Sequence, residues 1–274
     1  MTSFAGYAEV IGDPIDHSRS PTIHQFWIEK LKLDFDYRAS RVTRVELPAF
    51  LEQRLGEPAW RGCNVTMPLK LDALMLADGG SDLAVTAGAA NILVPKDGAL
   101  LAGNTDIGGV TQLLGPMLKE HGREGGITLL GNGGAARAVL VALHMMGVTN
   151  VRIQARDLSA AYKLAVEFGL EEEPRTFDRP IESAGLVNAT PLGMVGAPPL
   201  AIDIRSMPAK GGWVFDMVTE PVETPLLRRA RERGLATVDG IAMLVEQAAG
   251  SFHLLFGPDA PRQYDAELMA RLKP

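Results

Sequence analysis

The sequence is short of several features that would point to other classes of protein. It has one cysteine, Cys63, so no internal disulfide can form, which is typical of a reducing compartment. Its 33 acidic and 27 basic residues are mixed along the chain, so no basic patch predicts binding to nucleic acid or to a membrane surface. The start lacks the basic and apolar segments of a signal peptide, and no apolar run reaches the roughly 18 residues of a spanning helix. We therefore expect a cytoplasmic protein, a monomer or a homodimer, that acts on a small molecule.

Metal-binding and repeat patterns are also missing. The five histidines are scattered without the spacing of metal ligands, so the sequence predicts no metal site. There is no repeat at a fixed period and no low-complexity tract. With 274 residues, of which 46% are hydrophobic and 22% charged, the chain is long enough for two globular domains with sizeable cores.

Short apolar runs alternate with amphipathic segments, and this alternation predicts an α/β fold. We expect strands at residues 7–12, 35–39, 63–65, 90–94, 99–102, 127–130, 151–155, 185–188, 212–217 and 235–238. The lysine, aspartate and glycine at 96–98 indicate a hairpin between the fourth and fifth strands. The stretch 120–126 is polar and contains glycine, so we expect a new unit to begin there with a doubly wound sheet.

The clearest motif lies in this second unit. Residues 131–137 read GNGGAAR, directly after the strand 127–130 and before a helix predicted at 138–146. The pattern G-x-G-x-x-A in this context indicates a dinucleotide site, because the glycines permit a tight turn and close approach of a pyrophosphate to the helix N-terminus. The predicted cofactor-binding residues here are Gly131, Asn132, Gly133, Gly134 and Ala135.

The end of the next strand should contact the adenosine ribose, and its residues give opposing indications. Arg156 can pair with a 2′-phosphate, which favours NADP. Asp157 can accept a hydrogen bond from a free 2′-hydroxyl and repels a phosphate, which favours NAD.

Polar side chains follow two strands of the first half of the chain. Residues 64–70 read NVTMPLK, so Asn64, Thr66 and Lys70 lie at the carboxyl end of a strand, where ligands bind in open α/β sheets. Residues 18–21 read SRSP, which brings Ser18 and Ser20 to a helix N-terminus that suits a carboxylate or phosphate. We expect Ser20 to be the N-cap of that helix.

Two further polar residues stand near helices. The stretch 103–109 reads GNTDIGG, with Asp106 as its only acid, and precedes a helix predicted over 110–120. Gln247 lies in the largely apolar final helix that starts near Asp239. Each candidate also has a structural alternative: Lys70 as a solvated residue, Ser20 and Asp106 as helix caps, Gln247 as a surface residue.

Taken together, these motifs make the chain resemble the shikimate dehydrogenase family over nearly its whole length. The resemblance rests on SRSP at 18–21, NVTMPLK at 64–70, GAAN at 88–91, NTD at 104–106, the glycine loop at 131–137, NATP at 188–191 and the final helix from Asp239-Gly240 to Gln247. The order of these motifs along the chain makes the resemblance far more specific than the glycine loop alone.

The resemblance implies an NAD(P)-dependent oxidoreductase that interconverts 3-dehydroshikimate and shikimate, in aromatic amino acid biosynthesis through chorismate. Lys70 and Asp106 would be the catalytic pair. The substrate would be bound by Ser18, Ser20, Asn64, Thr66, Asn91 and Gln247, and the cofactor by Thr190 and Gly240 in addition to the residues named above. We expect an N-terminal α/β substrate domain over 1–106, a Rossmann domain over 107–238 and C-terminal helices over 239–274 that pack back on the substrate domain.

The chain departs from the family pattern at several positions. Thr219 stands where the family has a tyrosine near the substrate carboxylate, and Asn132 replaces a small residue in the glycine loop. Ala160 stands where NADP-preferring members carry a second arginine, so together with Asp157 it leads us to favour NAD. Two alternatives follow: a dehydrogenase of quinate or another shikimate-like hydroxy acid, and a non-catalytic dinucleotide-binding member of the family.

Overall fold

The computed structural model describes residues 5–121 and 125–273, which divide into two compact units. The first unit comprises Met1–Gly109 with Val245–Pro274, and the second comprises Val110–Leu244. The division falls within two helices, α5 (Thr105–His121) and α9 (Gly240–Phe256). In the described part of the chain, no helix combines the length and the apolar character that crossing a membrane requires.

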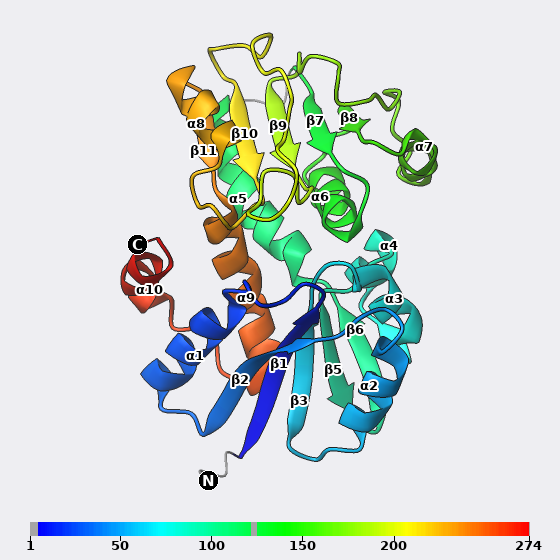
Figure 1. Cartoon of the computed structure of the whole chain (residues 1–274), viewed down its shortest axis with the longest axis vertical. Helices are drawn as coiled ribbons and strands as arrows, with labels where there is room; N and C mark the ends of the chain where they lie inside the picture. The colour runs from blue at the N-terminus through cyan, green and yellow to red at the C-terminus, as the bar shows by residue number, and fades with distance from the viewer. Residues whose placement is uncertain (1–4, 122–124, 274) are drawn as a thin grey trace. The chain divides into compact units, whose positions relative to one another are not determined.

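The first unit is built on a six-stranded mixed sheet in the order β2-β1-β3-β5-β6-β4 (Figure 1). The strands are β1 (Gly6–Gly12), β2 (Phe35–Arg41), β3 (Trp60–Val65), β4 (Gly79–Gly80), β5 (Ile92–Lys96) and β6 (Ala99–Gly103). Strands β2, β1 and β3 are parallel, whereas β5 pairs antiparallel with both β3 and β6. The predicted hairpin is confirmed: Asp97 and Gly98 join β5 to β6 with φ values of 51° and 81°, which suit a tight hairpin turn.

Helices cover both faces of this sheet (Figure 1). The helices of the unit are α1 (Ser20–Leu31), α2 (Leu47–Leu55), α3 (Lys70–Leu76), α4 (Asp82–Ala87), α9 and α10 (Asp265–Leu272). On one face, Leu47 and Leu51 of α2 pack with Cys63 of β3 in a buried cluster, so the cysteine is a core residue. On the other face, Trp27 of α1 contacts Phe252 of α9 edge to face.

The second unit is built on a parallel sheet in the order β11-β10-β9-β7-β8. The strands are β7 (Ile127–Leu130), β8 (Val151–Gln154), β9 (Gly185–Asn188), β10 (Trp213–Asp216) and β11 (Ala236–Val238); the helices between them are α6 (Gly134–Met145), α7 (Leu158–Glu167) and α8 (Pro225–Glu232). A single parallel bridge places Arg175 beside Gln154 of β8. With this bridge as a rudimentary third strand, the order is the 3-2-1-4-5-6 of a doubly wound Rossmann fold. The predicted fold class is confirmed, and the strand order reverses between β7 and β9.

Three sequence-based helix starts were wrong. Helix α6 begins at Gly134, inside the glycine loop, four residues before the predicted start at 138. Helix α5 begins at Thr105, five residues before the predicted start, because side chains accept its first N–H groups: Asn91 Oδ1 from Thr105 at 2.7 Å and Asn104 Oδ1 from Asp106 at 3.1 Å. Ser20 is the first residue of α1 rather than its N-cap; Arg19 holds that position without a capping side-chain bond.

Candidate active site

Neighbouring strand ends gather the polar residues of the first unit at one edge of its sheet. β1 and β3 run parallel with Ile11 opposite Val65, so the segments that follow both strands leave the sheet at the same edge. The N–H of Thr66 donates to the carbonyl of Ile11 at 2.9 Å. A Cβ on Gly12 would lie 2.5 Å from Cγ2 of Thr66, so the glycine allows this close approach.

Lys70 and Asp106 form a close ion pair. Lys70 is the first residue of α3, Asp106 lies in the first turn of α5, and Nζ of the lysine lies 2.5 Å from Oδ2 of the aspartate. The side chains are 15% and 7% exposed, so the pair is largely sheltered from water. Lys70 is therefore not a solvated helix residue, and the carboxylate of Asp106 is not used to cap α5.

Asn91 connects this pair to the rest of the site. It directly precedes β5 and is 2% exposed. Its Nδ2 group donates to Oδ1 of Asp106 and to Oγ1 of Thr105, both at 2.9 Å, and lies 3.4 Å from Oε1 of Gln247. Since Asp106 accepts from Lys70 on one oxygen and from Asn91 on the other, the plane of its carboxylate is fixed.

Asn64 at the end of β3 is held by partners on both sides of its amide. Its Oδ1 accepts from the hydroxyl of Tyr37 at 2.8 Å, and its Nδ2 donates to Oγ of Ser251 at 2.7 Å. Burial raises the pKa of Tyr37 well above its usual range, so the phenol remains a hydrogen-bond donor. These contacts determine the orientation of the Asn64 side chain.

Three residues of this network were missed by the sequence analysis: Tyr37, Thr105 and Ser251. Oγ1 of Thr105 lies 3.0 Å from Oγ of Ser251, and Ser251 also donates to the backbone carbonyl of Gln247. Ser251 follows Gln247 by four residues on α9, and this spacing on one helix face was a usable signal. Tyr37 left no such signal, because only the pairing of β2 with β1 and of β1 with β3 brings it near Asn64.

The hydrogen bonds bring together five of the eight predicted catalytic and substrate-binding residues: Asn64, Lys70, Asn91, Asp106 and Gln247. Within the described residues, no side-chain hydrogen bond joins Ser18, Ser20 or Thr66 to this network. Ser18 Oγ instead accepts from the N–H of Ser20 at 3.4 Å, at the start of α1. Burial differs between these three: Ser20 is buried, whereas Ser18 and Thr66 are partly exposed.

The predicted cofactor residues of the second unit lie at the carboxyl ends of β7 and β9, where the strand order reverses. Gly131 follows β7 with φ of 104°, and a Cβ there would lie 2.9 Å from Cγ2 of Thr190, which follows β9. Gly133 is the N-cap of α6 and has open space at its Cβ position. No side chain caps this helix in the described structure, so the N–H groups of Gly134 and Ala135 at its start are available to an anion.

The remaining predicted cofactor residues lie after β7, after β8 and at the start of α9. Asn132 Nδ2 lies 3.4 Å from the backbone carbonyl of Asp157, and the carboxylate of Asp157 accepts from the N–H of Ala160 at 3.0 Å, which caps α7. Arg156 is exposed. Gly240 starts α9, and a Cβ there would lie 2.2 Å from the carbonyl oxygen of Val218, so no larger residue fits.

Chemically, the first unit holds a sheltered ammonium–carboxylate pair surrounded by amides and hydroxyls, and the second holds a helix start whose N–H groups suit an anion. Such groups can donate protons and hydrogen bonds to a polyhydroxylated ligand. Within the ranges 5–121 and 125–273, no three His, Cys, Asp or Glu side chains form a cluster suited to a metal ion.

Comparison with known proteins agrees with these features. The family model described as the shikimate dehydrogenase substrate binding domain matches residues 10–93. A shikimate dehydrogenase (NADP(+)) of Sphingopyxis alaskensis is 43% identical over 97% of this chain and 96% of its own length.

Solved structures give the same result. Shikimate 5-dehydrogenase of Thermus thermophilus, solved in complex with NADP(H) and shikimate, matches with a TM-score of 0.83 and 34% identity over 97% of this chain and 99% of its own. Quinate dehydrogenase of Corynebacterium glutamicum, solved in complex with NAD, matches with a TM-score of 0.84 and 30% identity over 97% and 99%. From the fold, the motifs and these relatives, the chain belongs to the shikimate dehydrogenase family of NAD(P)-dependent oxidoreductases.

Proposed function

We propose that this protein interconverts shikimate and 3-dehydroshikimate with NADP(H). The observation that carries the proposal is the sheltered Lys70–Asp106 pair, joined through Asn91 to the other amides of the site. The unit of Met1–Gly109 with Val245–Pro274 would bind the substrate, and Val110–Leu244 the cofactor. The names of the Sphingopyxis relative and of the Thermus structure support both ligands.

The binding groups of the first unit suit a ring that carries one carboxylate and several hydroxyls. Ser18 and Ser20, at the N-terminus of the twelve-residue helix α1, would bind the carboxylate, where hydroxyls and the positive end of the helix dipole favour negative charge. The polar side chains of Asn64, Thr66, Asn91 and Gln247 would hydrogen-bond the ring hydroxyls.

In this proposal Lys70 handles the proton of the reaction. Reduction of a ketone leaves an alkoxide that must gain a proton, and oxidation of the alcohol removes one. The ammonium of Lys70 has three N–H donors, of which Asp106 takes one, so others remain for the reacting oxygen. Asp106, itself fixed by Asn91, would hold the ammonium in place. When bound, the nicotinamide supplies or accepts the hydride.

The second unit fits a dinucleotide, and we assign it NADP(H) from the names of its relatives. The uncapped start of α6 suits a pyrophosphate. Our preference for NAD is not confirmed, since the Sphingopyxis relative is named for NADP(+). The preference depended on the missing second arginine at position 160 and on Asp157, whose carboxylate accepts the N–H of Ala160 and caps α7. Arg156 is exposed beside it and would meet the 2′-phosphate.

Replacing Arg156 by alanine is expected to raise the KM for NADP⁺ by about tenfold and to leave the KM for NAD⁺ within about twofold, because only NADP⁺ has the phosphate. Steady-state rates with both cofactors measure this. The exposed Arg228 on α8 provides the control, since Arg228→Ala removes the same charge far along the sequence from the ribose site. Equal increases for both cofactors would show that Arg156 does not recognise the phosphate.

A second candidate is a quinate dehydrogenase, which is favoured by Thr219 at the position of the family's tyrosine and by the match to the Corynebacterium structure. The deciding experiment measures kcat/KM for shikimate and quinate with NADP⁺ and with NAD⁺. We expect shikimate with NADP⁺ to give the highest value, exceeding quinate by at least about tenfold. A higher value for quinate would establish the second candidate, and cofactor binding without turnover of either acid would indicate a non-catalytic member.

A further inference from the structure

Three buried polar side chains of the second unit are joined by hydrogen bonds near the ends of two strands. Asn188 ends β9, Asp216 ends β10, and Thr224 precedes α8; they are 0%, 1% and 1% exposed. Asn188 and Asp216 are register partners in the sheet. Because an isolated carboxylate is costly to bury, the hydrogen bonds around Asp216 indicate what it organises.

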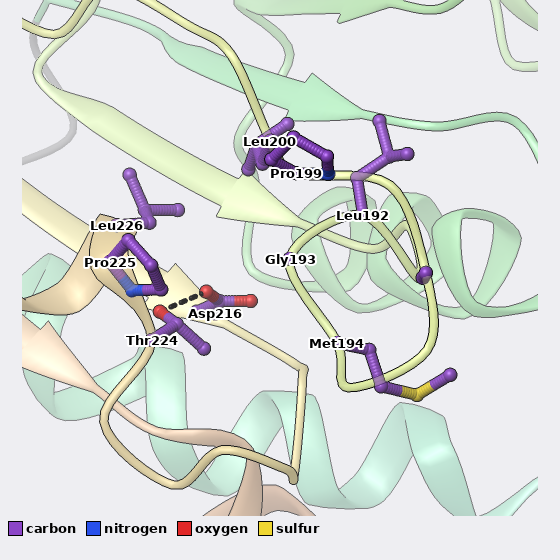
Figure 2. A pocket seen from close by; sticks show the side chains of 10 residues that line it. Leu192, Gly193, Met194, Pro199, Leu200, Asp216, Thr224, Pro225 and Leu226 are labelled. Carbon is purple, nitrogen blue, oxygen red and sulfur yellow. Dashed lines mark hydrogen bonds between the residues drawn. The ribbon is translucent and has the colours of Figure 1, made fainter.

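Asp216 is surrounded by donors. Its Oδ2 accepts from the hydroxyl of Thr224 at 2.6 Å, as the dashed line in Figure 2 shows. Its Oδ1 accepts from Nδ2 of Asn188 at 2.9 Å and from the N–H of Val218 at 3.2 Å. Burial raises the pKa of Asp216, and these hydrogen bonds act in the opposite direction. Both oxygens of the Asp216 carboxylate therefore accept hydrogen bonds, and neither donates one.

That acceptor fixes the amide of Asn188. Since Asp216 presents only oxygen, the NH₂ group of Asn188 must face it, and the amide oxygen must therefore point the other way. The oxygen accepts from both the N–H and the hydroxyl of Thr190, at 3.1 and 2.7 Å. The NH₂ group also donates to the carbonyl of Leu192 at 3.3 Å. Reversal of the amide would break the contacts to Thr190 and Asp216 together.

Thr190 transmits this orientation to the glycine loop. Its Oγ1 also accepts from the N–H of Leu192 at 3.1 Å. Hydrogen bonds of Thr190 to Asn188 and to Leu192 therefore hold the turn that follows β9. A Cβ on Gly131 would lie only 2.9 Å from the methyl group of Thr190, so the glycine allows the two segments to approach closely. Asp216 is thus linked through Asn188 and Thr190 to the ends of three adjacent strands, β10, β9 and β7.

A cavity borders this turn on the side shown in Figure 2. Its volume is about 240 Å³, and it is lined by Leu192, Met194, Leu200 and Leu226 together with Asp216 and Thr224. Atoms that line a cavity lack partners on that side, so the hydrogen bonds of Asn188 carry more of the restraint.

We propose that Asp216 is a positioning residue for the cofactor: through Asn188 it holds Thr190 and the turn over residues 189–192 against Gly131, in the conformation that binds NADP(H). This inference rests on the proposed function, which places the cofactor at this edge of the sheet.

The experiment compares Asp216→Ala with Thr224→Val. Both substitutions remove the buried hydrogen bond between Asp216 and Thr224, but only the first also removes the partner of Asn188. We expect Asp216→Ala to raise the Kd for NADPH, measured by fluorescence titration, by about tenfold and to leave the KM for shikimate within about twofold. Thr224→Val should lower the Tm and leave the Kd for NADPH within about twofold.

A double-mutant cycle that combines Asp216→Ala with Thr190→Val tests whether Asp216 affects cofactor binding through Thr190. If Asp216 acts through Thr190, the double variant binds NADPH no more weakly than the weaker of the two single variants, whereas additive losses would overturn the inference. Where Asp216→Ala does not fold, Asn188→Ala breaks the same link and leaves Asp216 with Val218 and Thr224 as partners.

Two further outcomes would also overturn the positioning role of Asp216. One is a loss of NADPH affinity in Thr224→Val equal to that in Asp216→Ala, which would indicate general destabilisation. The other is unchanged NADPH binding in both Asp216→Ala and Asn188→Ala while the wild-type protein binds and reacts, which leaves the proposed function intact. Failure of the wild-type protein to bind NADPH would overturn the proposed function, and this inference with it.

Discussion

Lys70→Met is expected to lower kcat for shikimate oxidation by a factor of about 10²–10⁴, the range that loss of a general acid or base produces. Methionine keeps much of the length and apolar stem of lysine but has no proton to transfer. Among the described residues, the ammonium is the only group that lies beside Asp106 as both a cation and a proton donor, at 2.5 Å. Initial rates of NADPH formation at saturating substrate measure the effect.

Lys70→Arg separates two roles of the residue. Arginine keeps the positive charge beside Asp106, but its guanidinium does not release a proton near neutral pH. If Lys70 transfers the proton, the arginine variant should be about as slow as the methionine variant; if its charge is sufficient, the rate should partly return. Lys96→Met, at an exposed position in the β5–β6 hairpin, is the control. A kcat for Lys70→Met within about threefold of wild type would contradict the catalytic assignment.

The second large effect concerns stability at acid pH and depends on His24 in α1. This side chain is fully buried, stacks on Tyr37 with ring centroids 4.0 Å apart, and has no hydrogen-bond partner for either ring nitrogen among the described residues. Burial lowers the pKa of His24 from 6.5 to about 3. The folded protein therefore keeps the ring neutral over a pH range in which the unfolded chain protonates it.

The sign of the effect follows from this difference. Above pH 6.5 the ring is neutral in both states, and below that pH the unfolded chain binds a proton that the folded chain does not. The free energy of unfolding should therefore fall as the pH drops from 6.5 towards 3, by up to about 5 kcal/mol from this one residue. Urea unfolding at a series of pH values measures the change.

His24→Leu removes the titrating group and should flatten this part of the pH dependence, whatever its effect on stability at pH 7. The exposed His144 on α6 offers the matched control, because His144→Leu should leave the slope as in wild type. Parallel curves for His24→Leu and wild type would show that burial of the imidazole does not determine acid stability.

Local patterns were enough to predict the elements of the second sheet. β7 and β9 coincide with the predicted strands 127–130 and 185–188, because each is a short apolar run bounded by polar or glycine-containing segments. The glycine loop was recognised by its position between a strand and a helix. The bridge at Arg175 was not predicted, because a single pair of residues leaves no periodic pattern.

The candidate site could be predicted only where a side chain belongs to a local motif. Asn64 and Lys70 were found because they end a strand and begin a helix, whereas Tyr37 was missed because the partner of its hydroxyl depends on strand pairing. The start of α5 was wrong for a related reason: the acceptor of its first N–H group is Asn91, from another part of the chain. The partner of Tyr37 and the start of α5 both depend on contacts between segments that are distant in the sequence, so local patterns could not predict them.

The edges of the two sheets bear on how the chain avoids aggregation. An exposed edge strand can template pairing with another molecule unless it is short or charged. The outer strands β4 and β11 have two and three residues, and the edge beyond β8 carries the single bridge at Arg175. The longest edge, β2, has seven residues, and Asp36, Arg38 and Arg41 place charges along it. Each edge thus offers little template for intermolecular strand pairing, which favours recovery of the protein at the concentrations used for refolding.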